Sequence, residues 1–148
     1  MTIILEKSEG GFGAWLEDCP VEFTGIHTFG ESVNEVTENI KMLMADLLEN
    51  EFKDTITFIG FNPNTVVFNY RYSLMDFFDV YKSLKINSIA ELAGLNKSLV
   101  RQYASGAATA SAAQVQKIQE AVRSLAQSLL QVEMVRSEEH TSELQSPC

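Results

Sequence analysis

Short apolar runs of the length of β-strands open the chain. Residues 2–7 (TIILEK) and 12–19 (FGAWLEDC) predict two strands, and the segment 8–11 between them, with two glycines, predicts the turn of a hairpin. Residues 23–30 (FTGIHTFG) predict a third strand. The three runs together indicate a small sheet.

Over residues 31–50 the pattern changes to the three- and four-residue steps of an amphipathic helix. Ser32 and Glu35 have the spacing of a capping box at its start. Two later runs, 55–61 and 65–72, predict strands on either side of a turn. The order β-β-β-α-β predicts an α+β fold, a small sheet backed by one helix. The apolar stripe of that helix comprises Val33, Val36, Ile40, Leu43, Met44, Leu47 and Leu48.

Helical periods continue after the sheet, beginning with a predicted helix at 73–85. Ser88 is expected to cap a short helix that Gly94 ends, and Asn96 to cap a second one that Gly106 ends. Two short helices joined by a tight turn that contains glycine are typical of the DNA-reading helix-turn-helix.

Spacing separates core positions from exposed ones in this pair of helices. The apolar positions suited to the contact between the helices are Ile89, Ala90, Ala93, Leu95, Val100 and Tyr103. Polar residues of the second helix share its other face, where Arg can pair with guanine, Gln with adenine, and Ser or Lys with phosphates. The candidate DNA contacts are Asn96, Lys97, Ser98, Arg101, Gln102 and Ser105. An ordinary α-hairpin with a solvated polar face is the alternative.

A long helix is predicted over residues 112–132, capped by Ser111. Its apolar series, in alternating three- and four-residue steps, is Val115, Ile118, Val122, Leu125, Leu129 and Val132. The near half is expected to pack on the short helices. The far half, Leu125, Leu129 and Val132, is expected to form a homodimer contact, since operators and their readers commonly share two-fold symmetry.

Charge divides along the chain in the same way as the predicted elements. Residues 1–81 hold four Lys and Arg against fourteen Asp and Glu, a net charge of −10. Residues 82–135 hold six against three, a net charge of +3, although the whole chain carries −9. This asymmetry indicates two different functions on one chain.

Candidate catalytic chemistry is sparse. The acidic residues lie on strand ends, a loop and the exposed helix face, and no His, Asp and Glu set has metal-ligand spacing. His27 stands alone, and Cys19 has no basic neighbour to lower its pKa. We therefore expect no catalytic residue, no metal, no cofactor and no enzyme. Without an apolar run of membrane-spanning length or a second cysteine before residue 136, a cytoplasmic protein outside the membrane is expected.

Residues 136–148 (RSEEHTSELQSPC) fit no element of the preceding pattern. The stretch from Arg136 to Ser146 reads like one frame of a sequencing-library adapter translated into protein. We interpret 136–148 as a non-native tail, on which reading Cys148 and His140 carry no functional meaning. A natural polar tail is the alternative.

Residues 12–49, from FGAWLEDCP through the helix that follows Gly30, resemble the antitoxin domain of the HicB family, a degraded ribonuclease H-like fold. The resemblance implies that residues 1–71 form a non-catalytic domain that covers a HicA-like toxin, a small basic ribonuclease. An acidic surface suits such a partner. The residues expected to face the toxin are Glu17, Asp18 and Glu22.

Residues 89–106 (IAELAGLNKSLVRQYASG) resemble the Cro/repressor-type pattern, which a final helix follows. This implies a DNA-binding domain over residues 73–135. Together the two resemblances imply an antitoxin that neutralises an mRNA-cleaving toxin by occlusion and represses its own operon. The alternatives are a stand-alone helix-turn-helix transcription regulator with a sensing or protein-binding front domain, and a metal-dependent nuclease using Asp18, Glu22 or Glu35.

Overall fold

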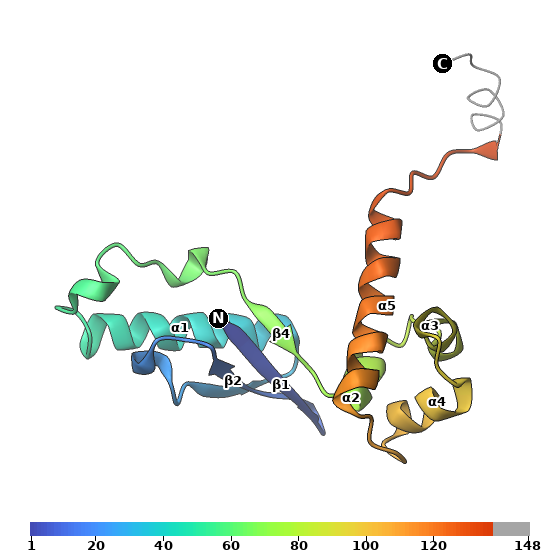
Figure 1. Cartoon of the computed structure of the whole chain (residues 1–148). Coiled ribbons are helices and arrows are strands. Elements are labelled where there is room, and N and C mark those ends of the chain that lie inside the picture. The colour runs from blue at the N-terminus through green and yellow to red at the C-terminus, as the bar shows by residue number, and fades with distance from the viewer. Residues whose placement is uncertain (138–148) are drawn as a thin grey trace. The chain divides into compact units, whose positions relative to one another are not determined.

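The computed structural model of the protein describes residues 1–137, which contain a four-stranded sheet and five α-helices, so the mixed α+β class is confirmed (Figure 1). Contacts divide the chain into two compact units, the first ending at Lys82 and the second beginning at Ser83. We call them the sheet unit and the helical unit. The division falls later than the boundary expected between residues 71 and 73, because α2 (Leu74–Val80) belongs to the sheet unit.

The predicted hairpin is formed by β1 (Thr2–Ser8) and β2 (Gly11–Glu17). Strand β3 (His27–Gly30) pairs antiparallel with β2, and β4 (Asn69–Arg71) pairs parallel with β1, giving the order β3-β2-β1-β4. A Cβ on Gly11 would lie 2.2 Å from the carbonyl oxygen of Gly30. Glycine at this position therefore allows β2 and β3 to approach each other.

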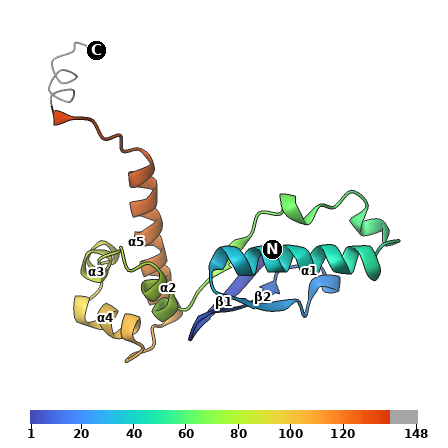
Figure 2. The same ribbon diagram turned by 180° about the vertical axis from the view of Figure 1, so that it is seen from behind.

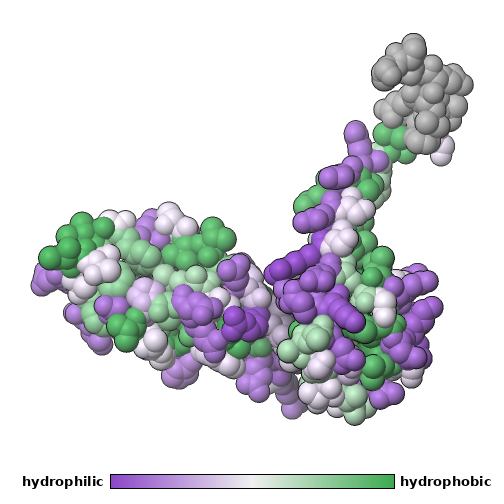
Figure 3. All heavy atoms as spheres, in the orientation of Figure 1, coloured by the Kyte–Doolittle hydropathy of each residue, from purple (hydrophilic) through white to green (hydrophobic). Residues whose placement is uncertain are grey.

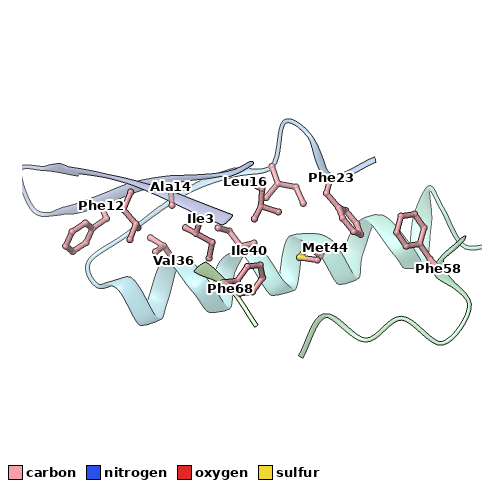
Figure 4. Close-up of a cluster of buried hydrophobic side chains, with 12 residues drawn as sticks. Ile3, Phe12, Ala14, Leu16, Phe23, Val36, Ile40, Met44, Phe58 and Phe68 are labelled. Carbon is pink, nitrogen blue, oxygen red and sulfur yellow. The ribbon is translucent and has the colours of Figure 1, made fainter. Parts of the chain in front are cut away.

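Helix α1 (Val33–Asn50) lies along the sheet, and the core fills the layer between them (Figures 2 and 4). Of the predicted stripe of α1, Leu43 alone is exposed. Ser32 caps the helix as predicted, its Oγ accepting from the N–H of Glu35 at 3.1 Å. The Glu35 carboxylate accepts from the N–H of Glu31 at 2.8 Å, one residue before the partner used in a capping box. The layer is built from Ile3, Leu5, Phe12, Ala14, Leu16, Val36, Ile40 and Met44.

Between α1 and β4 the predicted strand at 55–61 is wrong, because an aromatic cluster holds this segment in turns. The segment forms the 3₁₀ turn η2 (Ile56–Phe58), and a second 3₁₀ turn, η3 (Pro63–Thr65), follows it. The ring of Phe58 lies 5.1 Å from that of the fully buried Phe23, centroid to centroid, while Ile56 is 83% exposed. An aromatic pair buried on one side outweighs the strand propensity of the segment.

Two other strand predictions in the sheet unit hold only in part. The run 65–72 contributes just three residues to β4, and 23–30 becomes a strand only from His27. The residues before His27 include the 3₁₀ turn η1 (Val21–Phe23), which carries Phe23 into the core. Apolar residues that no strand pairing covers reach the surface of this unit (Figure 3), among them Val21, Ile56, Ile59 and Val67.

Helix α2 is attached to the end of β1. The Asp76 carboxylate accepts from the backbone N–H of Lys7 at 3.2 Å, and the Lys7 ammonium pairs with Asp79. Ser73 caps the helix, accepting from the Asp76 N–H at 3.1 Å. The prediction of a helix continuing to residue 85 is wrong, because α2 ends at Val80.

The helical unit contains α3 (Ile86–Ala93), α4 (Lys97–Ser105) and α5 (Ala112–Leu130), with α3 in contact with both of the others. Tyr103 of α4 donates a hydrogen bond to Gln114 Oε1 of α5 at 2.6 Å. The same Gln114 oxygen accepts from the N–H of Ser111, which completes a capping box. The buried side chains of this unit include Ile89, Ala90, Val100, Tyr103, Ile118 and Ala121.

Two predicted helix ends in this unit are wrong. Ser88 does not cap α3, because the N–H of Ile89 already bonds to the carbonyl of Lys85 and closes a helical turn around Ser88. Helix α5 ends at Leu130, where the N–H of Val132 turns back to the carbonyl of Leu129, so Val132 lies beyond the helix.

Within residues 1–137 no helix is long and apolar enough to cross a membrane.

Candidate nucleic-acid interface

The turn between α3 and α4 gives the helix pair its tight geometry. Gly94 ends α3 with φ of +68°, a left-handed conformation that glycine adopts without steric cost. The N–H of Leu95 then bonds back to the carbonyl of Ala90 at 2.9 Å. Asn96 caps α4 as predicted, its side chain accepting from the N–H of Leu99 at 3.1 Å. The two short helices that were predicted from the positions of Gly and Asn at their ends are therefore present.

Helix α4 has one buried side and one exposed side. Val100 and Tyr103 are buried against the rest of the helical unit. The six predicted DNA contacts are all exposed: Asn96, Lys97, Ser98, Arg101, Gln102 and Ser105. An exposed polar face of this composition can reach base edges and phosphates without unfolding the helix pair.

Local hydrogen bonds distinguish the members of this exposed face. The hydroxyl of Ser105 donates to the carbonyl of Gln102 at 3.1 Å and accepts from the N–H of Ala107 at 3.4 Å. Ser105 thus helps to end α4, in addition to any contact it makes with a ligand. The carbonyl of Gln102 also accepts from the N–H of Ala108 at 3.2 Å, so this end of the helix is well bonded.

Sequence reasoning missed one residue at this face, Asn87. Its Oδ1 accepts a hydrogen bond from Nη1 of Arg101 at 2.8 Å. Asn87 lies in the first turn of α3, fourteen positions before Arg101. No local pattern couples residues that far apart, so only the packing of the two helices could have indicated the pair.

Cations of the helical unit are available to an anionic ligand. Residues 83–135 hold five Lys and Arg against three Asp and Glu, a net charge of +2. None of the five is in an ion pair with another residue of the described chain. Those cations are Lys85, Lys97, Arg101, Lys117 and Arg123.

The residues expected to face a basic protein differ in their surroundings. Arg71 lies 2.8 Å from Glu17 and 3.6 Å from Asp18, counted from guanidinium nitrogen to carboxylate oxygen. Asp18, at φ of +52°, also accepts from the Thr2 hydroxyl at 2.9 Å. Glu22 is in none of these ion pairs. It is therefore the most available of the three predicted carboxylates.

Glu22 borders an open groove of about 400 Å³ between the segment 22–27, which leads into β3, and the second half of α1. Leu43 and Leu47 contribute apolar surface, and Asp46 and Glu51 contribute two further carboxylates. No Lys or Arg lines the groove, although His27 does. Such a surface combines apolar area with negative charge, and the charge complements a cationic surface.

The candidate catalytic groups do not assemble in the described chain. Residues 1–137 contain no group of three or more His, Cys, Asp and Glu side chains that could hold a metal ion. Of the carboxylates considered for a nuclease, Glu35 accepts from the N–H of Glu31 and Asp18 accepts from the Thr2 hydroxyl. Burial raises the pKa of the Cys19 thiol, which disfavours the reactive thiolate.

The three predicted dimer residues are not equally placed. Leu125 is half-buried on α5, whereas Leu129 and Val132 are 59% and 55% exposed. Leu130 is exposed next to them. A partly apolar surface therefore remains at the end of α5, although Val132 is outside the helix.

The helical unit has an exposed polar helix and cations that are in no ion pair with a described residue. The sheet unit has an acidic, partly apolar surface. Comparison of the chain with protein-family models, with curated proteins and with solved structures gave no match.

Proposed function

We propose that this protein is an antitoxin of the HicA/HicB type, which neutralises an mRNA-cleaving toxin with its sheet unit and represses its own operon with its helical unit. The toxin is a small basic ribonuclease, and its inhibition needs occlusion of its active surface, without catalysis by the antitoxin. The DNA is the operator of the operon, read in the major groove by α4.

The main support for DNA binding is the composition of the exposed side of α4. Arg101 and Gln102 are exposed there, while Val100 on the opposite side is fully buried. Arg and Gln are the side chains that pair bidentately with guanine and adenine. The αL turn at Gly94 supports the same function, because a tight turn that contains glycine joins the two short helices of a helix-turn-helix.

The charge of the sheet unit supports a basic protein as the second partner. Residues 1–82 carry a net charge of −9, which steers a cationic protein towards them and repels nucleic acid. The groove beside Glu22 adds apolar contact to this charge. Glu17 and Asp18 contribute less, because Arg71 already neutralises part of their charge.

The opposed charges of the two units also set the strength of DNA binding. A net +2 on the helical unit attracts phosphates weakly, and the acidic unit opposes that attraction. Operator affinity is therefore modest for the free antitoxin. Operator affinity rises when a basic toxin neutralises the charge of the sheet unit. It also rises when two copies dimerise through the end of α5 and each copy binds one half-site.

Operator binding is tested with DNA from upstream of the protein's own gene. The double variant Arg101→Ala, Gln102→Ala is expected to lose at least tenfold in affinity, since each base contact contributes about 1–3 kcal/mol. Arg123→Ala removes an exposed arginine from α5 and serves as the matched control. A double variant that binds the operator with full sequence preference would show that another element reads the DNA.

The toxin partner is tested by co-expression with the gene next to this one. Co-purification of a small basic ribonuclease, together with loss of its RNA cleavage in the complex, is the expected result. Folding and toxin inhibition are expected to survive the double substitution on α4. A protein that binds its operator but neither captures nor inhibits such a ribonuclease is a stand-alone transcription regulator, the second candidate function.

A further inference from the structure

Arg101 is the one predicted DNA contact on α4 with a hydrogen bond to the side chain of another helix of the described chain. Its Nη1 donates to Oδ1 of Asn87 at 2.8 Å. Both residues are exposed, so the pair lies at the surface that α4 presents to a ligand. Arginine has several rotatable bonds, and an exposed guanidinium without a partner samples many positions.

The bond to Asn87 leaves the guanidinium able to read a base. Arginine has five N–H donors in a planar fork, and one of them is directed to Asn87. The other four are sufficient for two parallel bonds to O6 and N7 of guanine. Asn87 also keeps both N–H donors of its amide, since only its oxygen is used here.

We propose that Asn87 is a positioning residue, which orients the Arg101 guanidinium for bidentate contact with a guanine of the operator. The inference rests on the DNA-binding function proposed above and assigns one source of its sequence preference. Pre-orientation lowers the entropy lost when Arg101 contacts the base, and an incorrectly placed base gains nothing from it. Asn87 therefore acts on the discrimination between sequences more than on affinity for DNA in general.

A purely structural role for Asn87 predicts a different result. Ile89 of α3 and Val100 of α4 are already buried and the two helices are in contact, so one exposed hydrogen bond adds little to the stability of the pair. If Asn87 merely joined the helices, its removal would weaken binding to all sequences alike. The ratio of affinities for matched and substituted DNA separates the two roles.

The experiment measures binding of the full chain to its operator and to a set of single base-pair substitutions by fluorescence anisotropy. The base pair read by Arg101 is identified as the one at which Arg101→Ala lowers the preference most, so that the discrimination remaining in that variant can still be measured. At that base pair, Asn87→Ala is expected to lower discrimination about three- to tenfold, the effect of one hydrogen bond. Affinity for unrelated DNA is expected to change less than twofold. Ser88→Ala, an exposed neighbour without a bond to Arg101, is the matched control.

Two further variants decide whether the effect passes through Arg101. In an Arg101→Ala background, Asn87→Ala is expected to cause no additional loss of discrimination. Asn87→Asp keeps an acceptor for Arg101, so discrimination is expected to return, while its negative charge lowers affinity for every sequence. Full discrimination in Asn87→Ala, or an equal loss with and without Arg101, would overturn the role of Asn87 and leave operator binding in place. A wild-type chain without any sequence preference would overturn both.

Discussion

The two units use their cations in opposite ways. In the sheet unit, four of the five Lys and Arg residues are paired with carboxylates, and a surplus of acid remains. In the helical unit, none of the five is in an ion pair with a described residue, although acids are present there too. Paired cations stabilise their own surface, whereas unpaired ones are available to an anionic ligand. Net charge alone therefore understates the difference between the two surfaces, because it does not show which cations are already in ion pairs.

The two units are expected to unfold independently of each other. A substitution in the core of the sheet unit tests this. Phe23→Ala is expected to lower the free energy of unfolding of the sheet unit by about 3–5 kcal/mol, because a fully buried ring is removed from contact with Phe58. Hydrogen exchange followed by mass spectrometry, at increasing denaturant, reports each unit separately.

The amides of the helical unit are expected to keep their protection in Phe23→Ala. Phe29→Ala, which removes a ring that is 53% exposed, is the matched control and should cost less than about 1 kcal/mol. Loss of protection in both units at the same denaturant concentration would mean that the chain unfolds as one cooperative body and that the comparison has no energetic basis.

Sequence predicted the helical unit better than the sheet unit, and Phe23 is part of the reason. In the helical unit the decisive signals are local: Asn96 caps α4 and Gly94 ends α3 at the residues where the pattern places them. In the segment after α1, the outcome depends on aromatic contacts of Phe58 with Phe23, thirty-five positions away. Periodicity within a short window cannot register such a contact.

The candidate site shows the same limit. Exposure of Arg101 and Gln102 was predicted from helical spacing, because burial of Val100 and Tyr103 fixes the opposite side of α4. The bond from Arg101 to Asn87 was not, since it depends on how α3 and α4 pack. Equally, the ion pairs of Arg71 at Glu17 and Asp18 depend on the parallel pairing of β4 with β1.

Operator binding by the helical unit is expected to depend on salt concentration much more than the stability of the sheet unit does. Raising the salt concentration from 50 to 200 mM is expected to lower operator affinity at least tenfold, because cations such as Lys97 and Arg101 release counterions from the phosphates. The ion pairs of the sheet unit are partly exposed and contribute little, so its unfolding should change much less over the same range. Fluorescence anisotropy and chemical denaturation measure the two effects. A salt-independent operator affinity would mean that the unpaired cations do not contact DNA.

Each unit contains a glycine with a positive φ, and substitution of each one measures the cost of backbone strain in its unit. Gly94 ends α3 at φ of +68°, and Gly60 in the sheet unit has φ of +78°. A Cβ at either position would meet no atom within 4 Å, so the expected cost comes from backbone strain alone. Gly94→Ala and Gly60→Ala should each lower the stability of their own unit by about 1 kcal/mol.

Thermal and chemical denaturation of the two glycine variants, with hydrogen exchange to assign the unit, check this prediction. Gly94→Ala is also expected to weaken operator binding, since it alters the turn that sets α4 against α3. Equal operator affinity in both variants would indicate that the turn angle is held by the buried contact between the helices and not by Gly94.

The smallest expected effect concerns Arg71, which pairs with Glu17 and Asp18 at the surface. Arg71→Ala should lower the stability of the sheet unit by less than about 1 kcal/mol, because exposed ion pairs contribute little. It also releases two carboxylates, so affinity for a basic ribonuclease partner is expected to rise about two- to fivefold. Isothermal titration of the purified partner measures the change.

Lys53→Ala is the matched control for Arg71→Ala, because it removes the same charge from the same unit and Lys53 is in none of the ion pairs of the described chain. Net charge acting at a distance predicts the same gain in partner affinity for both variants. Carboxylates released beside the partner predict a larger gain for Arg71→Ala. A gain in Lys53→Ala as large as that in Arg71→Ala would therefore place the basic partner away from Glu17 and Asp18, and would favour the groove bordered by Glu22, Asp46 and Glu51 as its contact.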